Sequence, residues 1–243
     1  EKGSPPPTPS LDCYRFRSAI GKGGYGVVFK AQHLDTLEWV AIKAIAKEKI
    51  RTKGLQKRVV KEIEVHDRLE HPHIVGLIDF KEDENFIYLV MEYCSGGNLY
   101  QLLRRKNREH GGGIGKGQTA RLVSQLADGV AYLHKHGVMH RDLKLSNLLL
   151  TRTGDLKIAD FGLAIVLELP GEEHFTVCGT PNYIAPEVAS VPQQGHGLDA
   201  DLWSVGVVLY SLLVGRLPFD CKNMSETLER VRQVDYTIPS AVP

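Results

Sequence analysis

The chain has 243 residues, with 30 Lys and Arg against 29 Asp and Glu, and a formal net charge of +1. Hydrophobic residues make up 42% and charged residues 24%, which is typical of a globular protein with a sizeable core. The near-neutral charge gives no general attraction to nucleic acid or acidic lipid. The four scattered cysteines form no CxxC pair, so we expect neither a disulfide framework nor a zinc site. We expect the protein to reside in a reducing compartment.

The first part of the chain has the pattern of a small β-rich lobe. It opens with EKGSPPPTPS, a Pro- and Ser-rich stretch that suits neither helix nor core, so we expect residues 1–12 to be a disordered leader. Residues 13–91 then contain several extended, β-forming segments, at 14–20, 27–31, 39–45 and 86–91. Between them, Leu55, Val59 and Ile63 are spaced by four, which predicts an amphipathic helix over 55–69.

The second part, residues 92–243, is predicted to be mainly helical. Apolar residues from Leu122 to Leu133 mark one face of a helix, and residues 202–214 are apolar on nearly every side, as in a buried helix. That stretch is shorter than the roughly 20 residues that span a bilayer, so we expect no membrane partner. We expect a hinge at 92–97 and a solvated basic connection at 104–117.

A glycine-rich turn lies between the first two strands. Gly21, Gly23 and Gly26 have the GxGxxG spacing, which alone is weak because an ordinary turn or a dinucleotide-binding loop can carry it. A dinucleotide-binding loop runs into a helix, whereas Val27-Val28-Phe29 continues as a strand. The glycines are therefore predicted to lie at a hairpin tip, where backbone N–H groups can approach phosphates closely.

A lysine occupies the apolar strand Val40-Ala41-Ile42-Lys43. Burying an unpaired ammonium group is costly, so Lys43 must reach a polar space or an anion. Glu62, on the helix predicted next in the chain, is the candidate partner. Such a pair would hold the ammonium toward phosphate, although a plain surface salt bridge, worth about 0–1 kcal/mol, is the alternative.

Two further motifs carry acids, bases and an amide. His140-Arg141-Asp142-Leu143-Lys144-Leu145-Ser146-Asn147 is followed, after a predicted strand, by Asp160-Phe161-Gly162. The oxygens of Asn147 and Asp160 suit Mg²⁺, which takes few protein ligands and completes its shell with phosphate and water. Asp142 is then left to accept a hydroxyl proton and Lys144 to neutralise a transferred phosphate.

Taken together, the motifs resemble those of eukaryotic protein kinases, with Ala185-Pro186-Glu187 as a further match. The resemblance implies an α+β, two-lobed fold with ATP bound between the lobes. It assigns catalytic roles to Lys43, Glu62, Asp142 and Lys144, and metal binding to Asn147 and Asp160. Nucleotide binding falls to Gly21, Lys22, Gly23, Gly24, Gly26, Val28, Ala41, Lys43, Met91, Glu92, Cys94 and Leu149.

The finer resemblance is to serine/threonine kinases of the polo-like family, of the centriole-duplication type. It rests on the segments HRDLKLSNLLLTR, HFTVCGTPNYIAPE and ETLERVRQVDYTIPS. It implies that Thr180 bridges Asp142 and Lys144, and that phosphorylation of Thr176 orders the surrounding loop by pairing with Arg141. The chain stops soon after Pro239, so the helical lobe is expected to be incomplete, and no polo-box region is present.

The sequence thus predicts a kinase that moves the γ-phosphoryl group of Mg-ATP to Ser or Thr hydroxyls of protein substrates. By resemblance, its place would be the cytoplasm, at the centrosome or centriole, in cell-cycle control. One alternative stays open at this level: a catalytically silent ATP-binding module or scaffold would carry the same fold without turnover. A dinucleotide-dependent oxidoreductase is disfavoured, because the glycine turn runs into a strand and not into a helix.

Overall fold

The structure is a computed structural model that describes residues 9–23, 26–169 and 171–240. Its contacts divide the chain into two compact units. Unit 1 comprises Glu1–Arg68 and Val75–Cys94, and unit 2 comprises Leu69–Ile74 and Ser95–Pro243. Residues 1–8, most of the predicted disordered leader, lie outside the described residues. None of the helices in the described part of the chain is both long and apolar enough to cross a membrane.

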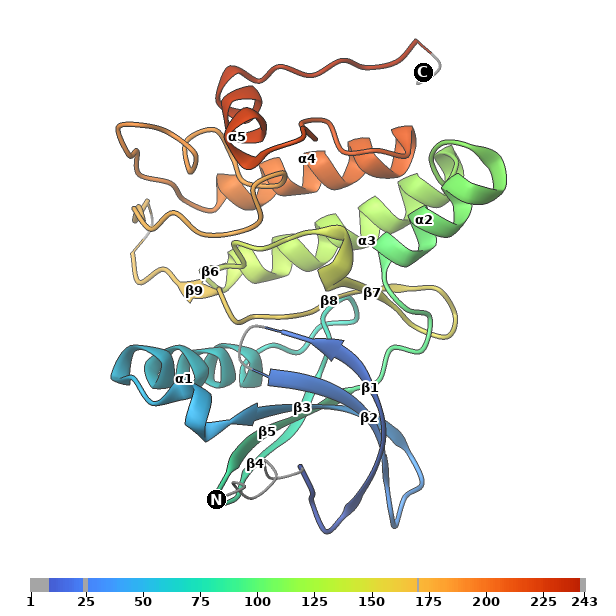
Figure 1. The fold of residues 1–243 in the computed structure, drawn as a ribbon, viewed down its shortest axis with the longest axis vertical. Coiled ribbons are helices and arrows are strands. Elements are labelled where there is room, and N and C mark those ends of the chain that lie inside the picture. The colour runs from blue at the N-terminus through green and yellow to red at the C-terminus, as the bar shows by residue number, and fades with distance from the viewer. Residues whose placement is uncertain (1–8, 24–25, 170, 241–243) are drawn as a thin grey trace, which may run out of the picture. The chain divides into compact units, whose positions relative to one another are not determined.

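Unit 1 is an antiparallel five-stranded sheet with one helix beside it (Figure 1). The strand order is β1-β2-β3-β5-β4. The elements are β1 (Tyr14–Lys22), β2 (Gly26–His33), β3 (Trp39–Ala46), the 3-10 helix η1 (Lys47–Ile50), α1 (Lys53–Asp67), β4 (Leu77–Glu82) and β5 (Phe86–Glu92). The α+β class and the antiparallel sheet are confirmed. Strand β4 was not predicted, because its side chains Ile78 and Phe80 are exposed and give no buried alternation.

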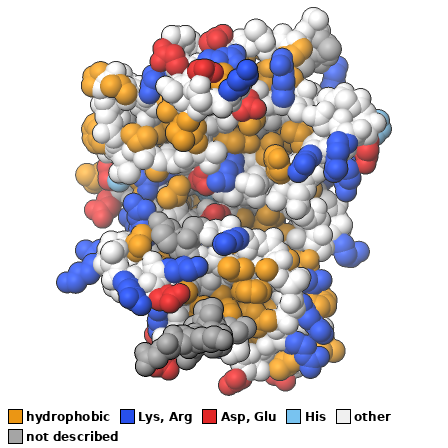
Figure 2. Space-filling model, viewed as in Figure 1, with side chains coloured by type: hydrophobic (Ala, Val, Ile, Leu, Met, Phe, Trp, Pro, Cys, Tyr) orange, Lys and Arg blue, Asp and Glu red, His pale blue; other side chains and the backbone are white. Residues whose placement is uncertain are grey.

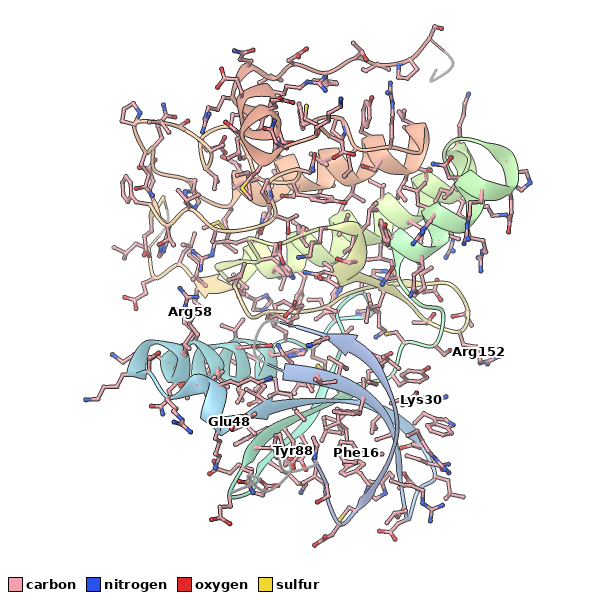
Figure 3. The ribbon with its side chains drawn as sticks, viewed as in Figure 1. Phe16, Lys30, Glu48, Arg58, Tyr88 and Arg152 are labelled. Carbon is pink, nitrogen blue, oxygen red and sulfur yellow. The ribbon has the colours of Figure 1, made fainter. Side chains whose placement is uncertain are left out.

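The two faces of this sheet carry separate apolar clusters. One includes Ile45 and Leu89 and packs against Val59 of α1. The other includes Tyr88, whose ring centroid lies 6.3 Å from that of Phe16 on the same face (Figure 3). Burial and a 2.6 Å hydrogen bond donated to Asp83 raise the pKa of Tyr88 to about 12.

The end of the predicted leader belongs to this second cluster. Leu11 packs against it, and the backbone N–H of Ser10 donates to the Tyr88 hydroxyl at 3.3 Å. Residues 10 and 11 are therefore attached to the sheet, ahead of the boundary that the sequence predicts at residue 13. Composition alone missed this because a single leucine in a Pro- and Ser-rich stretch gives no periodic pattern.

Unit 2 is mainly helical (Figure 1), and its described residues also form two short antiparallel strand pairs and three isolated β-bridges. Its helices are α2 (Leu99–His110), α3 (Lys116–Lys135), the 3-10 helix η2 (Leu145–Asn147), α4 (Asp199–Val214) and α5 (Met224–Gln233). Its strands are β6 (Val138–Met139), β7 (Leu148–Leu150), β8 (Leu156–Ile158) and β9 (Ile165–Val166). Helices α3 and α4 confirm the two apolar helices predicted from the sequence.

The predicted solvated connection at 104–117 is wrong over much of its length. Residues 104–110 continue α2, which starts at a capping box made by Asn98 and Gln101. The glycine-rich end is also tied down, since the N–H of Ile114 donates to the carbonyl of Leu212 at 2.8 Å. A Cβ added at Gly113 would lie 2.2 Å from that carbonyl oxygen, so only glycine fits there.

Substituting Gly113 tests this packing. We expect Gly113→Ala to lower the free energy of unfolding by about 1–3 kcal/mol, because backbone must move to admit the methyl group. The measurement is urea unfolding followed by circular dichroism. Gly206→Ala is the matched control, since that exposed site within α4 has open space for a Cβ. It should stabilise the protein by about 0.5–1 kcal/mol, and equal effects of the two changes would contradict the packing.

Candidate functional site

In unit 1, the predicted lysine and glutamate form an ion pair. Lys43 lies at the centre of β3, and its Nζ contacts Oε1 of Glu62 from α1. Both side chains are mostly buried, with 15% and 8% of their surface exposed. A surface salt bridge worth little is therefore the wrong description, because breaking a buried pair leaves an uncompensated charge. The helix thus fixes where the ammonium group points.

The strand register places the expected nucleotide-binding side chains on one face of the sheet. Val28 lies directly opposite Lys43, and Ala41 lies opposite Met91. Directly opposed residues of antiparallel strands share a face, as do residues two apart such as Ala41 and Lys43. A valine, an alanine and a methionine therefore flank the ammonium group on the side of the sheet that faces α1.

The glycine turn is a hairpin tip, as its sequence context predicts. Gly21 and Lys22 end β1 opposite Val28 and Val27, and the N–H of Gly23 donates to the carbonyl of Gly26 at 2.9 Å. A Cβ on Gly26 would lie 2.7 Å from the carbonyl oxygen of Ala44, so this position requires glycine. Gly24 lies outside the described residues. A helix does not follow the turn, which removes the structural basis of the dinucleotide-binding alternative.

The remaining expected adenine contacts lie in different units. Glu92 ends β5, and its backbone N–H donates to the carbonyl of Gly76 at 3.0 Å. Cys94 is the last residue of unit 1 and is half-buried. Leu149 lies on β7 of unit 2, opposite Lys157 of β8.

In unit 2, three predicted residues meet around the carboxylate of a fourth, Asp142. Lys144 Nζ donates to Asp142 Oδ2 at 2.6 Å, and Thr180 Oγ1 donates to Asp142 Oδ1 at 2.8 Å. Lys144 Nζ also lies 3.0 Å from Thr180 Oγ1, and Asn147 Nδ2 lies 3.2 Å from Asp142 Oδ2. A lysine, a threonine and an amide thus fix both oxygens of Asp142, which confirms the bridge that Thr180 was expected to make.

A buried acid that sequence reasoning missed holds the loop before Asp142. Asp201 of α4 is 1% exposed and accepts the backbone N–H groups of His140 at 2.8 Å and Arg141 at 2.9 Å. Arg141 adopts a left-handed backbone with φ 66°, which is costly for a residue with a side chain. The only hint in the sequence is the pair of acids, Asp199 and Asp201, in the first turn of an otherwise largely apolar helix.

The two expected metal ligands offer oxygen donors of the kind that Mg²⁺ prefers. The Asn147 amide nitrogen is engaged by the carbonyl and carboxylate of Asp142, which leaves its carbonyl oxygen outside those bonds. Asp160 has a left-handed backbone with φ 69° and lies two residues after the end of β8. Their oxygen donors therefore fit a hard divalent cation, and no cluster of three or more His, Cys, Asp or Glu in the described chain suggests a softer metal.

The expected regulatory threonine, Thr176, is exposed, and its expected partner, Arg141, makes a hydrogen bond of its own within unit 2. Thr176 lies in the segment between Phe161 and Glu187 with its side chain open to solvent. Arg141 donates from Nε to the carbonyl of Leu163 at 2.7 Å. It also lines a small cavity of about 20 Å³ with Cys178 and buried His196. Burial and, to a smaller extent, the charge of Arg141 lower the pKa of His196.

The Asp201 anchor can be tested by stability. Asp201→Asn keeps one carbonyl oxygen, so one of two buried N–H donors loses its acceptor, at an expected cost of about 1–3 kcal/mol. Urea unfolding of Asp201→Asn and of Asp199→Asn makes the comparison. Asp199 is exposed in the same helical turn, and its change should cost less than about 1 kcal/mol. Similar losses for both variants would rule out the anchor.

Comparison with known proteins agrees with this arrangement. Residues 14–241 match the family model described as protein kinase domain. The chain is 47% identical over 230 residues to serine/threonine-protein kinase PLK4 of Drosophila virilis, covering 95% of this chain and 29% of that protein. The same name is carried by relatives in Nematostella vectensis, 44% identical over 96% of this chain and 23% of the relative, and Xenopus tropicalis, 42% identical over 94% and 24%.

The chain spans less than a third of the length of these relatives. The polo-like resemblance of its motifs is confirmed by their names. Because the family model matches nearly the whole chain and its motif residues occupy an antiparallel sheet and a helical unit, the chain belongs to the protein kinase domain family.

Proposed function

We propose that this chain is an active serine/threonine kinase that transfers the γ-phosphoryl group of Mg-ATP to Ser and Thr hydroxyls of protein substrates. The observation that carries the proposal is the set of contacts around Asp142, whose oxygens are held by Lys144 at 2.6 Å and Thr180 at 2.8 Å. We further propose a polo-like role in cell-cycle and centriole control, in the cytoplasm at the centrosome or centriole, which rests on the names of the relatives alone.

Asp142 is the group that handles the hydroxyl proton. The substrate oxygen attacks the γ-phosphorus, the bond from that phosphorus to the β–γ bridging oxygen breaks, and ADP leaves with the bond's electron pair. The hydroxyl proton passes to the Asp142 carboxylate. Because the transition state is loose, the carboxylate chiefly orients the hydroxyl. Its fixed hydrogen bonds serve that purpose, since orientation requires a carboxylate that does not rotate.

The cationic groups balance the charge that spreads over the transferred phosphoryl group. Lys144 is placed at Asp142, and Lys43 is oriented by Glu62 in unit 1. Both are proposed to bind phosphate oxygens, where preorganised charge contributes most. Asn147 and Asp160 would hold Mg²⁺, which when bound neutralises phosphate charge and orients the leaving group.

A silent ATP-binding module is the competing interpretation. It would lack at least one of the groups that phosphoryl transfer needs. Here Lys43 has its carboxylate partner in unit 1, and Asp142 has its lysine and threonine in unit 2, so the groups of both units favour the active interpretation. Nothing in the described residues favours the silent alternative over the active one.

Replacing the proposed base tests activity directly. We expect Asp142→Asn to lower the rate of transfer of labelled γ-phosphate to a serine peptide by at least 10³-fold. Each ~1.4 kcal/mol added to the activation barrier lowers the rate tenfold. Protection from thermal unfolding by Mg-ATP should persist in the variant, because Asp142 acts on the hydroxyl.

The matched control is Asp155→Asn, which removes a carboxylate of unit 2 that pairs with Arg121 on the surface. It should leave the transfer rate unchanged within about twofold, as surface pairs contribute little. Equal signal from wild type and Asp142→Asn would show that the chain only binds nucleotide. Protection by NAD rather than ATP would instead favour the oxidoreductase.

Thr176 is proposed as the switch of this kinase. A phosphate there would add nearly two negative charges to an exposed segment and offer oxygens to a guanidinium. Arg141 is the proposed partner because it immediately precedes Asp142, so a charge that orders it also orders the base. Its Nε donates to the carbonyl of Leu163 at 2.7 Å, so the guanidinium already contacts the segment between Phe161 and Glu187 that carries Thr176.

Incubation with Mg-ATP tests the switch. Wild-type protein should gain at least tenfold in activity as Thr176 is modified, and phosphatase should reverse the gain. Thr176→Ala should stay at the unmodified level, whereas Thr153→Ala, at an exposed threonine in the β7–β8 turn, should behave as wild type. The proposal fails if Thr176→Ala retains full activity.

A further inference from the structure

The outer face of α2 is strongly basic although the chain as a whole is nearly neutral. The helix buries Leu99, Leu102 and Leu103. Arg104, Arg105 and Arg108 are exposed. Figure 2 shows Lys and Arg side chains gathered over this part of unit 2, at the right of the view. Arg104 and Arg108 are four residues apart and therefore lie one above the other on the helix surface.

Tertiary contacts bring a fourth arginine to the same place. Asn107 Nδ2 donates to the carbonyl of Gly215 at 2.8 Å, and its Oδ1 accepts the N–H of Gly112 at 3.1 Å. This amide bridges the end of α2 to the chain segment that follows α4. Arg216, the next residue, is exposed there. We call Arg104, Arg105, Arg108 and Arg216 the α2 basic face.

The α2 basic face has a rigid support. Gly113 packs against the carbonyl oxygens of Leu212 and Leu213 so closely that no other residue fits. The N–H of Ile114 also bonds to the Leu212 carbonyl at 2.8 Å. The arginines therefore project from a helix end that is fixed to α4, so their backbone positions do not have to be ordered when a ligand binds.

Acids within the fold do not neutralise the α2 basic face. The ion pairs of the described residues include none that involves Arg104, Arg105, Arg108 or Arg216. The nearest acid on the helix, Glu109, pairs with Lys106 at 3.3 Å instead. Arg108 Nε donates to the carbonyl of Arg104 at 3.3 Å, which uses only one of its five N–H donors.

The helix dipole explains only part of this charge. Cations in the last turn of a helix are stabilised by about 0.3–1 kcal/mol, which accounts for Arg108. Arg104 and Arg105 precede that turn, and Arg216 is outside the helix. Like charges four residues apart, as at Arg104 and Arg108, cost about 0.2–0.5 kcal/mol. The arrangement is therefore not one that helix stability favours, which points to an external anion.

We propose that the α2 basic face binds an acidic segment of the protein substrate, at a distance along the substrate chain from the phosphorylated residue. This inference rests on the proposed kinase function and adds a specificity determinant to it. Guanidinium groups bind carboxylates through paired hydrogen bonds, so Glu- and Asp-rich sequence is the chemistry that fits. Four arginines suit a short acidic run, whereas nucleic acid is favoured by a more basic protein than this one, with its net charge of +1.

Direct binding is the first test. A fluorescein-labelled peptide with six consecutive Glu residues is titrated with the protein, and anisotropy is read at 50 and 200 mM NaCl. We expect saturable binding that weakens at the higher salt. The triple variant Arg104→Glu, Arg105→Glu, Arg108→Glu should lose at least tenfold in affinity, and Arg216→Glu should lose about threefold.

Arg152→Glu is the matched control. Arg152 is an exposed arginine of unit 2 that points away from the fold at the β7–β8 turn (Figure 3). Its replacement by Glu changes the net charge by the same amount as each single replacement in the α2 basic face. It should keep wild-type affinity. If Arg152→Glu weakened peptide binding as much as Arg216→Glu, the binding would reflect general charge attraction and the proposal would be overturned. Preference for a labelled RNA or DNA oligonucleotide of equal charge over the Glu peptide would also overturn it.

Kinetics separate this inference from the kinase function. Two serine peptides are compared, one extended by six Glu and one by six Gln. In wild-type protein the Glu extension should lower KM at least fivefold with kcat unchanged, and the triple variant should lose that difference. Phosphorylation without any KM difference would overturn the α2 basic face alone. Glu-peptide binding by a chain that transfers no phosphate would overturn the kinase function alone.

Discussion

The chemistry proposed for this molecule depends on the fixed position of one carboxylate. Both carboxylate oxygens of Asp142 are hydrogen-bonded, one to Lys144 and one to Thr180. The loop before Asp142 is fixed by hydrogen bonds to the buried Asp201. The left-handed backbone at Arg141 is maintained because Asp201 accepts its N–H. A buried residue of α4 therefore holds the backbone just before the proposed base, and its bonds offset the strain at Arg141.

Unit 1 applies the same principle to an ammonium group. Lys43 sits among apolar neighbours on β3, where an unpaired charge would be costly, and Glu62 makes its position favourable. The helix α1 is thus coupled to the sheet by packing and by charge. The α2 basic face is a contrast, because its arginines are exposed and form none of the ion pairs found among the described residues, while Glu109 beside them pairs with Lys106. The first cation is proposed to bind phosphate, and the second set is proposed to bind a larger anionic partner.

Much of this could be predicted from local sequence, and the reasons for success and failure are physical. Helix α1 follows from Leu55, Val59 and Ile63, and the hairpin follows from glycines between β-forming runs. Helix α2 was missed because its apolar residues are confined to its first half, although Asn98 and Gln101 signal its start. The pairing of Asn107 with Gly215, 108 residues apart, has no local signature. Asp201 was missed for the same reason: its partners, two backbone N–H groups and the His134 ring, are 60 to 67 residues away in the sequence.

The most direct test of the account is a double-mutant cycle on kcat for Asp142 and Thr180. Thr180→Val removes the hydroxyl that bonds Asp142 Oδ1 and keeps the side-chain shape. If the threonine acts by orienting the carboxylate, Thr180→Val should reduce kcat in wild-type protein and have no further effect in Asp142→Asn, because coupled residues are not additive. The same fold reduction in both backgrounds would mean that Thr180 acts independently of Asp142, and the central role given to that carboxylate would be wrong.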